Sequence, residues 1–494
     1  MNFFKLIAQS SLALSKESEL ELDYFSGSKI KDEELTIFQI PKHRGLFLQV
    51  LLFFYKVLRN FKLFDKKKLK KPIFIFSETI NQFNALKTIT DALKEKGADF
   101  YFFISKNLSK KNFDLENIRL MKFNFNVILV CFILFFFRAL PLYLKLKKKN
   151  QKNKISIRFN QSCMSYIYVP YFIDILKKID PKIVLVSNDH SVSNRSLRLS
   201  AEMLNIKTIY LQHASVSEFF PPLEFDYALL DGKIAHQIYL SCYKNQTKEN
   251  LCTKNNIKNC EIILSGQKKL VIKKNRNREL SELNIGLAVN EQDSFFYVQE
   301  LLNHINNNKT KCIVRTHPAQ DQVFIEKLRK YIEDKDWLIW SDAREQMISD
   351  YFAKINIMIA SNSSIHLEAA IAGLPTFYYE MSENPVTQDY YGYIKNGISL
   401  RLKKNFSLNM LRPLIKNTFN STQREQAIKN YSQTYNTFWQ NREGQLTAIV
   451  IDKILNNEPL DEFFVIEQQL IYKKVWSLKN IVPPTLKEQG EELK

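Results

Sequence analysis

Residues 355–375, INIMIASNSSIHLEAAIAGLP, contain a strand, a polar turn and a helix in direct succession. The first six residues are almost all apolar, serines stand where the helix would begin, and Gly-Leu-Pro follows its end. An earlier run, KCIVR at 311–315, reads as another strand and leads into Thr-His-Pro. Strands that alternate with helices in this way predict a parallel sheet with helical crossovers.

The same alternation extends to both sides of this stretch. Predicted helices separate the strands, for example at 193–204, 294–308 and 322–332. Strands are predicted at 72–77, 99–105, 182–187, 207–211, 284–289, 311–315, 337–340, 355–360 and 375–379. The pattern restarts after a basic stretch, so we predict an α/β protein with two Rossmann-like, doubly wound domains facing a cleft.

At 494 residues the chain is too long for one ordinary domain. Ligands of open α/β sheets bind beyond the carboxyl ends of the strands, so functional residues are expected directly after strands. We predict an N-terminal extension with a membrane-surface helix (1–70), a first domain (71–265), a basic linker (266–283), a second domain (284–423), and C-terminal helices with a tail (424–494).

Composition narrows the classes of function. The six cysteines form no C-x-x-C pair, which argues against a zinc module or a disulfide framework. The net charge of +20 implies an acidic partner, which could be a nucleic acid, an anionic membrane surface or a phosphorylated substrate. The phosphate-binding patterns G-x-x-x-x-G-K-[ST] and G-x-G-x-x-G are both missing from the sequence.

Two apolar runs, 46–64 and 127–137, are each followed by a cluster of lysines. The second run has 11 uninterrupted apolar residues, whereas a bilayer span takes about 20. A helix that lies in the membrane interface, with lysines at the headgroups, fits this pattern. A buried core helix followed by a solvated charge run is the alternative.

Arg315 and His317 stand at the end of a predicted strand. Pro318 biases His317 toward an extended conformation, so both side chains can be held at the strand tip. A cation and an imidazole at that place suit a phosphate. A surface arginine followed by a turn-forming His-Pro pair is the alternative.

Ser361, Ser363 and Ser364 follow the strand at 355–360. Serines at the start of a helix cap it, and that end offers free N–H groups to an anion. Glu368 lies one turn after Ser364 on the same face, where a carboxylate could hold ribose hydroxyls. Ordinary capping by the serines and a solvated glutamate are the alternative.

These two blocks, R-x-H-P and S-S-x3-E-A-A-x2-G-x-P about 45 residues later, resemble the HP and Ser-Ser motifs of bacterial GT-B glycosyltransferases. The similar families are capsule polysaccharide biosynthesis proteins, sialyl- and polysialyltransferases, Kdo transferases and CDP-glycerol glycerophosphotransferases. The resemblance spans roughly residues 180–380. It implies that His317, Ser363 and Ser364 bind the phosphate of a nucleotide-activated donor, and that no metal or other cofactor is needed.

The catalytic base is expected from the first domain. Asp189 and His213 both follow predicted strands, at sites from which an acceptor hydroxyl could be reached. Either a carboxylate or a neutral imidazole can accept the proton of that hydroxyl. The glycerophosphotransferases carry a His-Gly pair at the place of His213, but here Ala214 follows the histidine, and the sialyltransferases use an acidic base.

The function predicted from the sequence is inverting glycosyl transfer, with a CMP- or CDP-linked donor and a surface polysaccharide or lipid-linked acceptor. The first domain would bind the acceptor and the second the nucleotide sugar. The expected location is the inner face of the bacterial cytoplasmic membrane. A UDP-sugar 2-epimerase and a non-catalytic, membrane-associated partner in polysaccharide assembly are the alternatives. A nucleic-acid binder is disfavoured, because the basic residues cluster beside apolar helices rather than among aromatic residues.

Overall fold

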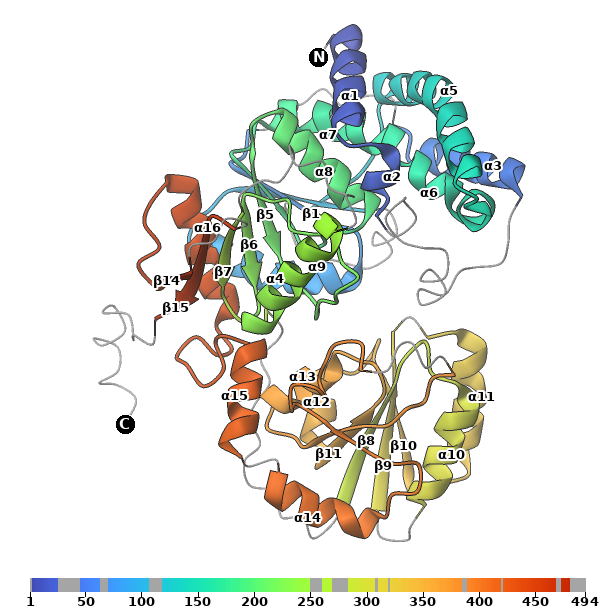
Figure 1. Ribbon diagram of the computed structural model, residues 1–494, viewed down its shortest axis with the longest axis vertical. Coiled ribbons are helices and arrows are strands. Elements are labelled where there is room, and N and C mark those ends of the chain that lie inside the picture. The colour runs from blue at the N-terminus through green and yellow to red at the C-terminus, as the bar shows by residue number, and fades with distance from the viewer. Residues whose placement is uncertain are drawn as a thin grey trace.

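The chain forms two α/β domains, each built on its own sheet (Figure 1). The computed structural model describes residues 2–24, 45–62, 70–105, 118–248, 260–268, 283–306, 310–318, 320–383, 389–418, 421–467 and 472–479. Most of the predicted basic linker, residues 269–282, and the last part of the predicted tail lie outside these ranges. The predicted fold class, two doubly wound α/β domains, is confirmed.

The first sheet has nine strands in the order β14-β15-β7-β6-β5-β4-β1-β2-β3. Neighbouring strands run parallel, except that β14 and β15 are antiparallel. The strand bounds are β1 (Ile73–Ser77), β2 (Phe100–Ile104), β3 (Ile118–Leu120), β4 (Ile183–Val186), β5 (Lys207–Leu211), β6 (Tyr227–Leu230), β7 (Glu261–Leu264), β14 (Phe463–Glu467) and β15 (Lys474–Leu478). Chain order reverses between β1 and β4, and such a switch point is where open α/β sheets bind ligands.

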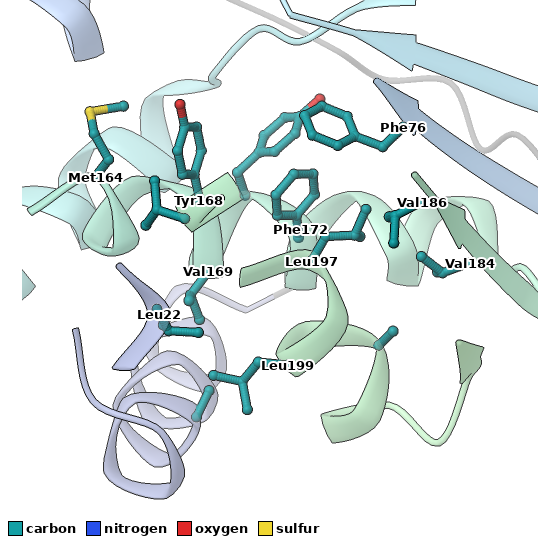
Figure 2. Packing of buried hydrophobic residues seen from close by; sticks show 14 of the residues in the cluster. Leu22, Phe76, Met164, Tyr168, Val169, Phe172, Val184, Val186, Leu197 and Leu199 are labelled. Atoms are coloured by element: carbon teal, nitrogen blue, oxygen red, sulfur yellow. The ribbon is translucent and has the colours of Figure 1, made fainter. Parts of the chain in front are cut away.

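The first sheet is buried on both faces because alternate strand residues point to opposite sides. Phe74, Phe76, Val184 and Val186 belong to one core cluster, and the residues between them belong to another. Figure 2 shows Phe76, Val184 and Val186 close to Phe172 and Leu197, which come from α7 and α8. Helices α4 and α16 cover the opposite face.

The helices of this domain follow the chain. Two long ones, α5 and α7, contain a proline each and remain continuous. Their bounds are α1 (Phe3–Lys16), α2 (Glu19–Leu22), α3 (Leu46–Leu58), α4 (Ile80–Glu95), α5 (Phe125–Lys148), the π-helical turn η3 (Lys154–Arg158), α6 (Phe159–Cys163), α7 (Ser165–Ile179), α8 (Val192–Met203) and α9 (Lys233–Lys248). Helices α1, α2 and α3 pack into the core shared with α5 and α7, so the N-terminal extension forms part of this domain.

The second sheet has six parallel strands in the order β10-β9-β8-β11-β12-β13. Its strands are β8 (Leu283–Val289), β9 (Thr310–Thr316), β10 (Leu338–Asp342), β11 (Ile357–Ala360), β12 (Thr376–Tyr378) and β13 (Leu400–Arg401). Its helices are α10 (Phe295–Ile305), α11 (Gln322–Glu333), α12 (Ile348–Ala353), α13 (Ile365–Ile371) and α14 (Leu408–Thr418). A helix was predicted near 343–353, but it begins only at Ile348, and a turn precedes it.

The chain returns to the first domain after α14. Helix α15 (Thr422–Tyr431) contacts α9 of the first domain and α13 of the second, and α16 (Glu443–Asn456) packs on α4. The sequence predicted these helices but not β14 and β15, which extend the first sheet. Both strands carry charged residues and lie toward the sheet edge, so neither shows the continuous apolar run of a central parallel strand.

Candidate functional site

A cavity of about 400 Å³ lies between the two domains, and both domains contribute to its lining. The first domain supplies residues of α4, residues after β5, and Lys268 after β7. The second supplies the ends of β8 and β9, the turn before α12, and the start of α13. Of the residues predicted from sequence, the cavity brings together His213, Arg315, His317, Pro318, Ser363, Ser364 and Glu368.

Arg315 is a largely buried cation in the wall of this cavity. Its guanidinium donates one hydrogen bond of 3.1 Å to Ser341 Oγ and another of 2.8 Å to the carbonyl of Gln346. It also lies 5.3 Å from the ring centre of Tyr351. Burial lowers the pKa of Arg315, although an arginine keeps its charge near neutral pH. These contacts hold a positive charge in a fixed position before any ligand arrives.

His317 follows the end of β9, where its backbone N–H donates to the carbonyl of Val289. Its ring Nδ1 lies 4.0 Å from Glu291 Oε2. Burial lowers the pKa of His317, and the nearby carboxylate of Glu291 only partly opposes that shift. The ring is therefore mainly neutral at pH 7 and can donate one N–H to a ligand in the cavity.

The three serines after β11 have different surroundings. Ser361 is buried outside the cavity lining, and its hydroxyl donates to Asp293. Ser363 and Ser364 line the cavity, and the Ser364 hydroxyl lies 3.5 Å from Glu368 Oε1. Helix α13 has seven residues, so the hydroxyls and the first backbone N–H groups provide most of its ability to bind an anion.

His213 lies on the first-domain side of the cavity, in the segment that follows β5. Gln212 fixes this segment: its amide donates to the carbonyl of Ala214, and its side-chain oxygen accepts from the N–H of Asp231. The hydroxyls of Ser215 and Tyr393 form a hydrogen bond that ties the segment to the second domain. His213 is thereby held opposite the donor-binding motifs.

Asp189 does not line this cavity. It is buried, and its carboxylate accepts from the Tyr239 hydroxyl at 2.6 Å and from His190 Nδ1 at 2.8 Å. Asn188 bonds the other ring nitrogen of His190, which fixes the tautomer that donates to Asp189. The structure therefore places Asp189 in a buried network of the first domain.

The sequence analysis missed Lys268, Asn81, Asn84 and Arg344, which also line the cavity. Lys268 is buried after β7, and its ammonium donates to the carbonyls of Gly266 and Leu229 and lies 3.8 Å from Asp231. Burial lowers its pKa to about 8. The rule that functional residues follow strands would have found Lys268, but β7 is a short apolar run that periodicity does not identify.

Gly266 explains how the chain brings Lys268 into this position. Its φ of +80° is a conformation that favours glycine, and a Cβ there would lie 2.1 Å from the Thr434 hydroxyl oxygen. The chain can therefore turn sharply after β7 against the segment that precedes α16. Lys268 follows two residues later, with its ammonium at the cavity.

The lining is positively charged overall, because Lys268, Arg315 and Arg344 outnumber Glu345 and Glu368. Such a lining favours a ligand that carries phosphate groups. Among the described residues, no three His, Cys, Asp or Glu side chains come together as a metal site would require. Whether the reaction needs a metal stays a prediction from the sequence.

No family model and no curated protein matches the chain. Among solved structures it is similar to UDP-GlcNAc 2-epimerase from Neisseria meningitidis bound to UDP-GlcNAc (11% identity, TM-score 0.46, 78% of this chain and 99% of that chain covered). It is also similar to MurG from Acinetobacter baumannii (10%, 0.40, 77% and 99%) and to the wall teichoic acid polymerase TagF (11%, 0.44, 83% and 98%). At these identities and scores, the likeness carries no argument about function, which rests on the cavity itself.

Proposed function

We propose that the protein is an inverting, metal-independent glycosyltransferase that uses a nucleotide-activated donor. One observation carries the proposal: a single interdomain cavity joins the residues of the HP and Ser-Ser motifs to His213 on the opposite domain. Donor-binding groups on one domain and a base on the other suit a transfer between two bound substrates. The acceptor would be a growing bacterial surface polysaccharide or a lipid-linked glycan.

The second domain would hold the diphosphate or monophosphate of the donor. Arg315, His317, Ser363 and Ser364 supply hydrogen-bond donors of different kinds within one cavity wall. As the bond between the anomeric carbon and the phosphate oxygen breaks, negative charge grows on the departing nucleotide. Donors that are already held in place stabilise that charge without reorganisation. Glu368 is suited to accept hydrogen bonds from the ribose hydroxyls.

His213 would act as the base on the acceptor. Its neutral imidazole takes the proton of the acceptor hydroxyl while that oxygen attacks the anomeric carbon from the face opposite the phosphate. One such displacement inverts the configuration at that carbon. His213 is preferred to Asp189 because only His213 lines the cavity, whereas Asp189 is committed to Tyr239 and His190.

The nucleotide is proposed to be cytidine-based, by resemblance to sialyltransferases and glycerophosphotransferases. The alternative, a UDP-sugar 2-epimerase, would require several carboxylates around the sugar. Among the described residues that line the cavity, the carboxylates are Glu345 and Glu368, and both belong to the second domain. This distribution favours transfer over epimerisation.

A thermal-shift screen of the purified protein with CMP, CDP, UDP, GDP and ADP tests the proposal. A ligand at one hundred times its dissociation constant stabilises the folded state by about 2.7 kcal/mol, which gives a visible shift in Tm. We expect a cytidine nucleotide to give the largest shift and His317→Ala to abolish most of it. His304→Ala is the matched control, because His304 bonds the carbonyl of Phe406 outside the cavity lining.

Product analysis with the matching nucleotide sugars then separates the alternatives. A transferase releases free nucleotide from the donor, whereas an epimerase converts a UDP-sugar into its C2 epimer. Epimerisation by the wild-type protein would overturn the proposal in favour of the enzyme alternative. The absence of a shift with all five nucleotides would overturn it in favour of a non-catalytic partner.

A further inference from the structure

Helix α5 exposes an apolar stripe along the side that does not face the protein. Val127, Cys131 and Leu134 point into the core of the first domain. On the outer side, Phe136 and Phe137 are 72% and 78% exposed. The other large apolar side chains exposed on this helix are Phe125, Leu129, Leu140 and Leu144, most of them at helical spacing from Phe136. The helix is thus apolar on both sides.

Helix α3 adds a second exposed apolar stripe next to the first. Phe54 of α3 meets Phe132 of α5 edge-on at 5.4 Å, and Phe53 stacks on Phe135 at 5.0 Å. Figure 1 shows the two helices beside each other on the side of the first domain away from the second. The exposed apolar side chains of α3 are Leu46, Phe47, Leu48, Leu51, Tyr55 and Leu58. We call the two stripes together the α3–α5 face.

Exposed lysines follow the apolar stripe of α5 at its carboxyl end, at positions 145, 147, 148 and 149. Near the amino end of α5, Lys62, Arg119, Lys122 and Lys178 line a cavity of about 330 Å³ with one carboxylate, that of Asp174. This basic cavity also borders exposed apolar residues, because Phe61 pairs with Phe123 in a β-bridge. Positive charge therefore stands at both ends of the α3–α5 face.

An apolar face of this extent is unusual for a soluble surface and marks an interaction site. Its pattern, apolar side chains with lysines at the ends, matches a bilayer in which the acyl chains lie beneath negatively charged headgroups. A protein partner would require a complementary surface, whereas a bilayer requires only these two features. Charge complementarity therefore selects the membrane.

Helix α5, with 24 residues, is the one helix among the described residues that is long and apolar enough to cross a membrane. It nevertheless packs along α7 and α1 of the first domain. In its middle, Arg138 bonds Glu19 Oε1 at 2.5 Å and the carbonyl of Leu14 at 3.0 Å. Crossing a bilayer would break these contacts and place Arg138 in hydrocarbon, which is costly.

We infer that the α3–α5 face docks onto the surface of an anionic bilayer without crossing it. The exposed side chains of α3 and α5 enter the acyl region. The terminal lysines of α5 and the cations of the basic cavity bind headgroup phosphates. This inference is independent of the proposed function, because none of these residues lines the interdomain cavity.

Vesicle sedimentation with the full-length protein tests the inference, using phosphatidylcholine alone and phosphatidylcholine mixed with phosphatidylglycerol. We expect tighter binding to the anionic vesicles, with release by salt or alkaline carbonate. The double variant Phe136→Ser/Phe137→Ser should bind at least about tenfold more weakly. Lys145→Gln and Lys147→Gln should each weaken binding by about fivefold on anionic vesicles only. Phe296→Ser, at a phenylalanine of α10 that is 66% exposed, is the control and should bind like the wild type.

A second measurement keeps the apolar surface intact. Phe137→Trp should lose fluorescence in vesicles that contain brominated acyl chains, whereas Phe296→Trp should not. The inference is overturned if the serine double variant binds vesicles like the wild type, or if the protein resists carbonate extraction as a spanning protein would. It is also overturned if the wild type ignores vesicles and instead forms a dimer that the serine variant cannot form.

Discussion

The hydroxyl of Tyr239 donates a hydrogen bond of 2.6 Å to Asp189 Oδ2 in the buried interior of the first domain. His190 Nδ1 lies 2.8 Å from the other oxygen of the same carboxylate. Both oxygens of Asp189 thus have protein partners. An ion or acid in such a network holds neighbouring elements together, here the end of β4 and helix α9. This relationship separates Asp189 from His213, two residues that the sequence could not rank.

Replacing His213 by Ala should remove turnover and leave donor binding intact. General base catalysis contributes about 10²- to 10⁴-fold, so nucleotide release should fall by roughly that factor. The nucleotide-induced shift in Tm should match that of the wild type, because the donor motifs lie on the other domain. Nucleotide release is measured with the donor identified by the screen. Unchanged turnover in His213→Ala would remove this residue from the mechanism.

Asp189→Asn should act on stability. The amide cannot accept from both Tyr239 and His190 as the carboxylate does, so the free energy of unfolding should fall by about 1–3 kcal/mol. Urea denaturation of the variant and the wild type measures this change. If instead Asp189→Asn folds with full stability and loses turnover, then Asp189 is the base and the assignment to His213 is wrong.

Lys268 gives a prediction for pH. Burial lowers its folded-state pKa from 10.5 to about 8, against the opposing charges of Asp231 and Glu443. Between these two values, the unfolded state binds more protons than the folded state, so this group's contribution to the free energy of unfolding rises with pH. Below the folded-state pKa the contribution is flat.

The comparison of wild type with Lys268→Met isolates this effect. The difference in free energy of unfolding should shift in favour of the wild type as pH rises from about 8 to 10.5. Urea denaturation across that range measures it. Lys330→Met, which replaces an exposed lysine on α11, should show no such trend relative to the wild type. A difference for Lys268→Met that does not change with pH would mean that the ammonium is not buried.

Ser364→Ala and Ser361→Ala form a matched pair. Ser364 lines the cavity, so its replacement should weaken nucleotide binding by about 2- to 10-fold, the equivalent of one hydrogen bond, and leave stability nearly unchanged. Ser361 instead donates to buried Asp293, and its replacement should lower the free energy of unfolding by about 1–3 kcal/mol. Titration calorimetry and urea denaturation measure the two effects. The reverse pattern would contradict the geometry described for this turn.

The contact between Ser215 and Tyr393 joins the segment of His213 to the second domain. Close to it, the rings of Phe219 and Tyr390 stack at 5.9 Å with an interplanar angle of 8°. Tyr393→Phe should loosen His213 relative to the donor, so turnover should fall while nucleotide affinity stays the same. Tyr331→Phe, which removes an exposed hydroxyl bonded to Asn303, is the control. Equal turnover in the two variants would show that this tie does not position His213.

Local patterns predicted much of the fold because central parallel strands are buried on both faces and read as continuous apolar runs. The strands at β1, β4, β5 and β8–β12 were found in this way, as were the helices between them. Strands β6, β7, β14 and β15 were not. The first two are short apolar runs of four residues, and the last two are mixed in polarity.

The sequence by itself determined two Rossmann-like domains and placed Arg315, His317, Ser363 and Ser364 at strand ends, because strand and turn signals are local. Only the tertiary structure decided which distant strand ends share one cavity. It brought His213 and Lys268 to the donor motifs and buried Asp189 in the first domain. It also showed that α5 is half core and half exposed. Convergence and exposure depend on how the sheets pack and cross, and residue order alone does not specify either.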